Sequence, residues 1–181
     1  MAASWALAYH CLLRTHEFVQ LRVQDVVVNP SLGRGVVQLH NTKYGARQGT
    51  TESCTIDCST TAAMASRAAR GRMPGDPLME VTDARMRSLF REACDCLGLA
   101  DLGFRPYSLR RGGATFDFRS HGQLSRTVVR GRWNNARTAR IYINEGVGML
   151  TQLRLPPATE LLISNSVDLL KATLISSLAD G

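Results

Sequence analysis

The stretch Phe104–Tyr142 reads FRPYSLRRGGATFDFRSHGQLSRTVVRGRWNNARTARIY, and the fold assignment of the chain depends on it. It combines many arginines with a Gly-Gly pair, a tryptophan and a terminal tyrosine. Arginine matches phosphate oxygens in a bidentate geometry, whereas lysine acts as a point charge. The stretch holds no glycine-rich loop of the type that binds mononucleotides. We therefore expect a partner that carries many phosphates.

The composition of the whole chain indicates a basic globular protein. Its 181 residues are 44% apolar, which is enough to form the core of one domain plus a tail. The net charge is +7 and the pI about 9.6. Lys43 and Lys171 are the only lysines, so the positive charge comes almost wholly from arginine. A high genomic GC content is an alternative explanation for this bias.

The cysteines and histidines do not indicate a metal site. Five cysteines have no paired spacing and four histidines are scattered, so we expect no zinc and no cofactor, and thiols that stay reduced. No apolar run approaches the roughly 20 residues that span a bilayer. The first 13 residues lack the basic segment of a signal peptide. We expect an intracellular protein, in the nucleus or the cytoplasm.

Residue patterns before Phe104 predict helices and a small antiparallel sheet. Alanine and leucine predict a helix over 2–13, and Thr15 is expected to cap the next one. Runs of β-prone residues around a glycine-containing turn predict a hairpin or small sheet. Apolar spacing and breaker residues predict two further helices. The expected strands are 26–28, 35–41 and 51–58, and the expected helices 60–70 and 82–97.

Two helices are predicted within the arginine-rich stretch and one after it. Ser108 is expected to cap a helix that begins near Leu109, which puts Arg110 and Arg111 close to a helix N-terminus that favours anions. The Gly-Gly pair lets this helix pack closely against a neighbour or DNA. A second helix, 136–143, carries Tyr142. The tail 146–181 contains an amphipathic helix after two prolines.

Four motifs together resemble those of the tyrosine recombinases, the phage-integrase family of DNA breaking and rejoining enzymes. The segment LLRTHEFVQLRVQDV is similar to the first family box and places Arg14, Glu17 and Asp25. The segment NTKYGARQG is similar to the hairpin turn that carries the family's lysine, which makes Lys43 the candidate.

The second and third boxes lie inside the arginine-rich stretch. YSLRRGGAT is similar to the second box, with Arg110 in the arginine position and Tyr107 in place of the family's histidine. RGRWNNARTARIY is similar to the third box, with Trp133 nine residues before Tyr142. The boxes occur in family order, and the resemblance covers residues from about 5 to 145.

The resemblance implies a fold and a domain organisation. The expected fold is α+β, mostly helical with a small antiparallel β-sheet, like the catalytic domain of a tyrosine recombinase. Residues 1–145 are expected to form this domain and 146–181 a helical tail, which either docks on a neighbouring protomer, as it can in the family, or packs on its own domain. The family's N-terminal DNA-clamp domain has no counterpart in this chain, so we expect a truncated gene product, a relic of a mobile element or one domain of a larger product.

It also implies a chemistry, in which Tyr142 attacks a phosphodiester of double-stranded DNA and forms a 3′-phosphotyrosine without a metal or cofactor. Arg14 and Arg110 stabilise the charge of the transition state, and Lys43 protonates the leaving oxygen. Trp133 donates its indole N–H to the phosphate.

Three further assignments complete the implied site. Glu17 orients the neighbouring catalytic groups. Tyr107 can hydrogen-bond a phosphate, but with an ordinary pKa near 10 it is a poor base. Further DNA contacts are expected from arginines of the same stretch, namely Arg105, Arg111, Arg132 and Arg137. Recombination also implies protomers that assemble on DNA.

Three other functions agree with the same sequence. A catalytically impaired DNA-binding remnant of an integrase would keep the basic surface and lose the covalent step. A type IB topoisomerase shares much of the constellation, although the spacing of the third box favours the recombinase. An RNA-binding or merely basic structural domain predicts no special role for Tyr142.

Overall fold

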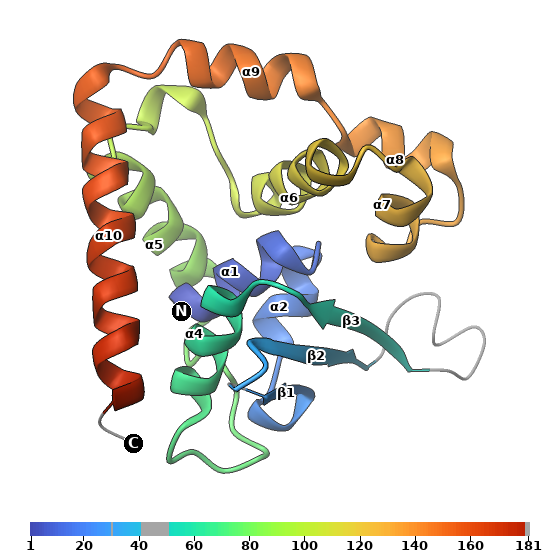
Figure 1. Cartoon of the computed structure of the whole chain (residues 1–181), viewed down its shortest axis with the longest axis vertical. Coiled ribbons are helices and arrows are strands. Elements are labelled where there is room, and N and C mark those ends of the chain that lie inside the picture. The colour runs from blue at the N-terminus through green and yellow to red at the C-terminus, as the bar shows by residue number, and fades with distance from the viewer. Residues whose placement is uncertain (30, 41–50, 180–181) are drawn as a thin grey trace.

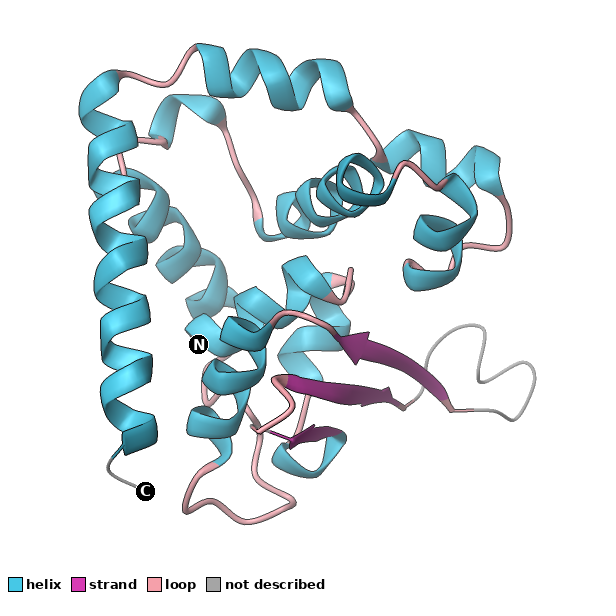
Figure 2. Cartoon of the chain, in the orientation of Figure 1, coloured by secondary structure: helices cyan, strands magenta, loops and turns pink. Residues whose placement is uncertain are grey.

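The computed structural model describes residues 1–29, 31–40 and 51–179. It confirms the predicted class, a mostly helical α+β fold with a small antiparallel sheet (Figure 2). In chain order the elements are α1 (Ala2–His10), α2 (Thr15–Gln20), η1 (Val23–Asp25), β1 (Val26–Asn29), β2 (Arg34–Leu39), β3 (Glu52–Ile56), α4 (Ser59–Ala69), α5 (Asp83–Cys96), η2 (Ala100–Leu102), α6 (Pro106–His121), α7 (Leu124–Arg130), α8 (Ala136–Tyr142), α9 (Glu145–Leu153) and α10 (Pro157–Ala179).

The sheet has the order β1-β2-β3, and both pairs of strands are antiparallel. Val37 of the central strand pairs with Val26 on one side and Cys54 on the other. Side chains alternate along β2, so that Val37 and Leu39 are buried while Val36 and Gln38 face solvent. One face of the sheet therefore contributes to the core and the other is solvated.

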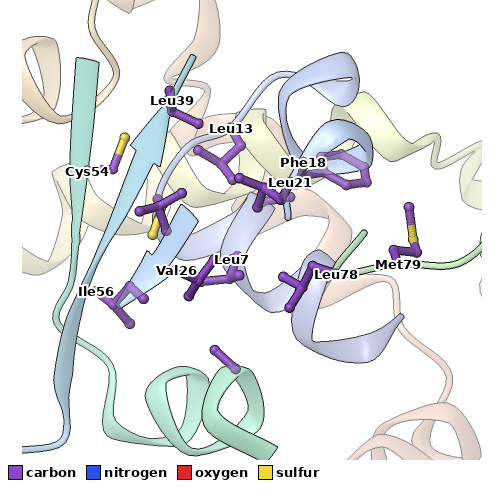
Figure 3. Close-up of a cluster of buried hydrophobic side chains, with 14 of the residues drawn as sticks. Leu7, Leu13, Phe18, Leu21, Val26, Leu39, Cys54, Ile56, Leu78 and Met79 are labelled. Atoms are coloured by element: carbon purple, nitrogen blue, oxygen red, sulfur yellow. The ribbon is translucent and has the colours of Figure 1, made fainter. Parts of the chain in front are cut away.

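The main hydrophobic core lies between the buried face of the sheet and helices α1, α2 and α4 (Figure 3). Leu7 of α1, Phe18 of α2 and Ile56 of β3 are completely buried there. Leu78 and Met86, from the segment after α4 and from α5, join the same cluster. The core thus connects the first box of the sequence to the hairpin.

Helices α6, α7, α8 and α9 lie above this core, and α6 crosses α1 closely (Figure 1). Gly113 makes the crossing possible, because a Cβ atom at this position would overlap the carbonyl oxygen of Tyr9. The Gly-Gly pair therefore serves the contact between α6 and α1.

Two helices begin one or more residues away from their predicted starts. Thr15 is the first residue of α2, and Glu17 accepts the N–H of Arg14 at 2.7 Å, so Thr15 is not the cap. The helix expected near Leu109 begins at Pro106, because proline is preorganised for the first helical position. Ser108 reaches back to the N–H of Arg105 at 3.1 Å. Arg110 consequently lies inside the helix rather than at its N-terminus.

The C-terminal part contains two helices. α9 contacts α6, and α10 runs along the side of the molecule that carries α4 and α5 (Figure 1). Thr159 near the start of α10 is buried against Gly98, at the end of α5. Other α10 side chains, such as Leu161 and Leu169, are exposed. Within the part of the chain that the structure describes, no helix has the length and apolar character needed to cross a membrane.

Candidate active site

Arg110 lies at the centre of the candidate site. Its side chain projects from α6 into the interior, where only 1% of the residue is exposed. The guanidinium donates to the carbonyl of Leu12 and, through Nη2, to the carbonyl of Gly131 at 2.7 Å. Both acceptors belong to the main chain of turns, one after α1 and one after α7. The guanidinium orientation is therefore fixed by the backbone.

Two aromatic rings pack around the Arg110 guanidinium. Its Cζ atom is 4.8 Å from the centroid of the Trp133 ring and 5.3 Å from that of the Tyr142 ring. The two rings are themselves 4.8 Å apart. Such distances correspond to cation–π contacts, which are stronger in a desolvated setting. The structure thus brings Arg110, Trp133 and Tyr142 together.

Tyr107 extends this aromatic group on the solvent side. Its ring centroid is 5.8 Å from that of Tyr142. Partial burial and a hydrogen bond with Tyr142 together raise the pKa of Tyr107 to about 12. The Tyr107 phenol therefore stays neutral near pH 7. It can donate a hydrogen bond but is not suited to act as a base.

Glu17 joins two arginines at the edge of the site. Its carboxylate accepts hydrogen bonds from Nη1 of Arg14 at 2.6 Å and from Nη2 of Arg132 at 2.7 Å. Burial opposes ionisation of Glu17, but the charges of Arg132 and Arg14 outweigh it and hold the pKa below its ordinary value. Glu17 is thus ionised and fixes both guanidinium groups.

The site carries more positive than negative charge. Burial, together with the charges of Arg14 and Arg132, lowers the pKa of Arg110 to about 10. Glu17 offsets one of these three cations, and Glu52 approaches Arg132 at 3.6 Å. Three guanidinium groups against two carboxylates leave an excess of one positive charge, which favours an anion in the site.

The orphaned polar atoms point to a missing hydrogen-bonding partner. Among the described residues, neither Nε of Arg110 nor the indole Nε1 of Trp133 has an acceptor, although both atoms are buried. Unpaired buried donors are costly and rare in folded proteins. Two donors beside Tyr142 are suited to the oxygens of a phosphate.

The arginines that were predicted to bind DNA differ in exposure. Arg105, Arg111 and Arg137 are exposed. The side chain of Arg132 is only 7% exposed and is paired with Glu17, and its backbone has a φ of +54°. DNA contact by these four residues stays a prediction.

Asp25 of the first box is not part of the cluster around Arg110. Lys43 lies outside the residues that the structure describes. Asp25 is buried, accepts the N–H of Arg22 at 2.8 Å, and lies 3.2 Å from the ring of His40. Asp25 therefore closes the turn into β1. Across residues 1–29, 31–40 and 51–179, no three His, Cys, Asp or Glu side chains are grouped so that they could hold a metal ion.

A hydroxyl on α6 holds the segment that follows Tyr142. Thr115 Oγ1 accepts the N–H of Asn144 at 3.1 Å and lies 3.4 Å from the Tyr142 carbonyl oxygen. Asn144 in turn accepts the N–H of Val147 and so caps α9. The end of α8 is therefore attached to the same helix that carries Arg110.

An ion-pair network that sequence reasoning missed supports α7. Asp117, buried in α6, accepts the hydroxyl of Thr127 at 2.6 Å. Arg130 pairs with Asp57 at 2.6 Å and donates to the carbonyl of His10 at 2.7 Å. These partners are up to 120 positions apart in the chain, so no local sequence signal marks them. The network holds the turn that provides the Gly131 carbonyl.

No protein-family model matches the sequence, and no curated protein matches it either. Solved structures are similar in three dimensions. The XerH site-specific recombinase bound to difH substrate, in a pre-cleavage complex, has a TM-score of 0.61 and 15% identity, over 77% of this chain and 41% of the XerH chain. The post-cleavage complex of XerH with palindromic difH substrate has a TM-score of 0.60 and 15% identity, over 77% of this chain and 40% of the XerH chain.

The XerA recombinase is similar in the same way, with a TM-score of 0.58 and 16% identity over 83% of this chain and 55% of the XerA chain. The chain thus spans between two fifths and just over half of these recombinases. At this level of identity the likeness establishes the fold. The fold of the chain is that of the catalytic domain of tyrosine recombinases.

Proposed function

We propose that this protein breaks and rejoins double-stranded DNA, with Tyr142 as the nucleophile. The observation that carries the proposal is the position of Arg110, held by two main-chain carbonyls with its guanidinium in contact with the rings of both Trp133 and Tyr142. A phosphate at this point meets a cation, an indole N–H and a phenol together. The recombinase fold supports the same proposal.

In the proposed reaction the Tyr142 hydroxyl attacks phosphorus and releases its proton to water. The bond from phosphorus to the 5′ oxygen breaks, which leaves a 3′-phosphotyrosine and a 5′-hydroxyl. Arg110 and Arg14 stabilise the extra negative charge in the transition state. Lys43 is the proposed donor of the proton that the 5′ oxygen takes up. Attack by a 5′-hydroxyl reverses these steps and seals the strand.

A second candidate is a DNA-binding protein that has lost the covalent step. It is favoured by Tyr107, which occupies the position of the family's histidine and whose raised pKa of about 12 rules it out as a base near neutral pH. Assembly of several protomers on DNA belongs to the recombinase proposal and not to this alternative.

Covalent trapping on nicked suicide duplexes of varied sequence distinguishes the two. We expect the unmodified protein and an Arg91→Gln control, on the exposed face of α5, to form a denaturant-resistant DNA adduct and Tyr142→Phe to form none. A Tyr107→His variant supplies a group that titrates near pH 7 and should increase the yield. Duplex binding without any adduct, in Tyr107→His as well, would establish the second candidate.

A further inference from the structure

A cavity of about 830 Å³ lies beside the candidate site, between α6 and α9. Its walls come from these two helices, from the segment 102–104 and from Tyr9, and Tyr142 forms part of its rim. Its volume is in the range of pockets that hold small ligands. Neither the proposed phosphate site nor the recombinase motifs explain this cavity.

The walls of the cavity are aromatic and accessible. Phe116 is 50% exposed and Phe104 is 37% exposed. The ring of Tyr9 lies 5.8 Å from that of Phe116. By contrast, the exposed apolar side chains of α10 are aliphatic, for example Leu161 and Val167. Accessible aromatic rings provide flat surfaces on which nucleobases stack.

The charge of the cavity is positive. Arg111 and Arg119 line it, and none of the described residues that line it is acidic. Burial raises the pKa of Tyr9 and the charge of Arg119 opposes the rise, which places that guanidinium near the Tyr9 hydroxyl. Cations combined with accessible aromatic rings are typical of surfaces that bind single-stranded nucleic acid.

The cavity and the phosphate site share one helix and one tyrosine. Arg110 and Arg111 are adjacent on α6, and the first points into the protein while the second lines the cavity. Tyr142 contacts Arg110 and also lies at the cavity rim. A nucleotide next to a phosphate bound at Tyr142 is therefore within reach of the cavity. Ser108, Asn144 and Gln152 offer polar groups for the edges of a base.

We propose that this cavity binds an unpaired nucleobase of the DNA strand that Tyr142 attacks, with the base on Phe104 and Phe116 and the adjoining phosphates at Arg111 and Arg119. The inference rests on the proposed function, because it places the strand at Tyr142. It adds a requirement that the phosphate site alone does not make: the DNA must present a base outside the duplex.

Binding of short oligonucleotides by the full chain tests the proposal. The Tyr142→Phe background prevents covalent capture. The probes are a fluorescent hexamer of deoxythymidine and an abasic strand with the same number of phosphates. Phe116→Leu keeps an apolar side chain but removes the ring, and we expect it to weaken binding of the thymidine strand about 5-fold or more while binding of the abasic strand stays unchanged.

The arginines give the complementary result. Arg111→Gln should weaken binding of both strands, because phosphates are present in each. Arg91→Gln on the exposed face of α5 is the matched control and should change neither. Thermal melting of each variant verifies the fold. Because Phe116 is half-exposed, its side chain contributes little to the stability of the fold.

Three outcomes overturn the inference. Equal affinity for the thymidine and abasic strands excludes a base site, as does a Phe116→Leu variant that binds both strands normally. A change in sedimentation on Phe116→Leu, with base binding intact, assigns the cavity to a second copy of the chain.

The adduct assay tests the proposed function separately. If adducts form but binding does not depend on the base, the proposed function stands and the base site is excluded. If binding depends on the base but no adduct forms, only the strand transfer is excluded.

Discussion

The main core and the candidate site hold their side chains in different ways. In the core, Phe18, Leu7 and Ile56 are buried among other apolar groups, and the sheet and three helices surround them. In the site the buried apolar cluster is small and includes Leu12 and Trp133. A guanidinium lies beside it, held by carbonyls. The core is stabilised mainly by area removed from water, and the site by directed polar contacts.

Because of this difference, we expect substitutions in the two regions to have different effects. A loss of volume in the core lowers the stability of the whole fold. A loss of one polar contact in the site changes the position of a few groups at a smaller cost in stability. The following predictions test this division, beginning with the largest change in the free energy of unfolding.

The largest effect is expected for Phe18→Ala in the main core. Phe18 is completely buried, so its truncation should lower the free energy of unfolding by about 3–5 kcal/mol. Chemical denaturation measures this change. Phe116→Ala, at a half-exposed position, should cost far less. A similar cost for both substitutions would contradict the assignment of the core.

The second largest effect is expected for Gly113→Ala, where the two regions meet. The new Cβ would overlap the Tyr9 carbonyl oxygen and force α6 away from α1. We expect a loss of about 3 kcal/mol, near the upper end for overpacking. At Gly112 a Cβ would be 3.2 Å from the mobile end of the Tyr9 side chain. Gly112→Ala should therefore be tolerated better when the two variants are compared by chemical denaturation.

A smaller loss of stability is expected for Arg110→Met. The carbonyls of Leu12 and Gly131 lose their donor, but a buried charge is removed at the same time, so the net cost should be about 2 kcal/mol. DNA adducts should disappear completely. Arg91→Met, on the exposed face of α5, is the control for both measurements. An Arg110→Met protein that is as destabilised as Phe18→Ala would show that the site is a second structural core.

The smallest effect concerns the pH dependence of Glu17. Its pKa in the folded protein lies below the ordinary value of 4.5, so its stabilisation is complete above about pH 4.5 and is lost as the pH falls through the lowered pKa. When the pH is lowered from about 6 to about 3, the free energy of unfolding should decrease by about 1 kcal/mol less in Glu17→Gln than in the unmodified protein. Urea denaturation at several pH values measures this. Glu92→Gln, in an exposed ion pair, should keep the original pH profile.

Local sequence patterns predicted much of the fold. The run of β-prone residues over 35–41 identified β2, and the apolar spacing around Met86 and Phe90 identified α5. Helix starts were less accurate. Pro106 begins α6 earlier than Ser108 suggested, because a proline at the first helical position competes with a serine cap.

The site was predictable where its residues belong to short motifs. The motifs named Arg110, Trp133 and Tyr142, and the structure brings these three together. The pairing of Arg132 with Glu17 was not predictable, since the two residues are 115 positions apart. No sequence pattern states which distant charges become neighbours, and only the tertiary fold decides it.

The two carbonyls that hold Arg110 imply unequal tolerance to mutation. Because the acceptors are backbone atoms, a change of side chain at position 12 leaves the Arg110 acceptor in place. Leu12 has a φ of +52° and a completely buried side chain, so other apolar residues that fill the same space should be accepted there, whereas a polar side chain should not. Gly131 has no such freedom, because any Cβ would overlap the ring of Trp133. Among variants that still bind a phosphate at Arg110, we therefore expect several apolar residues at position 12 and only glycine at position 131.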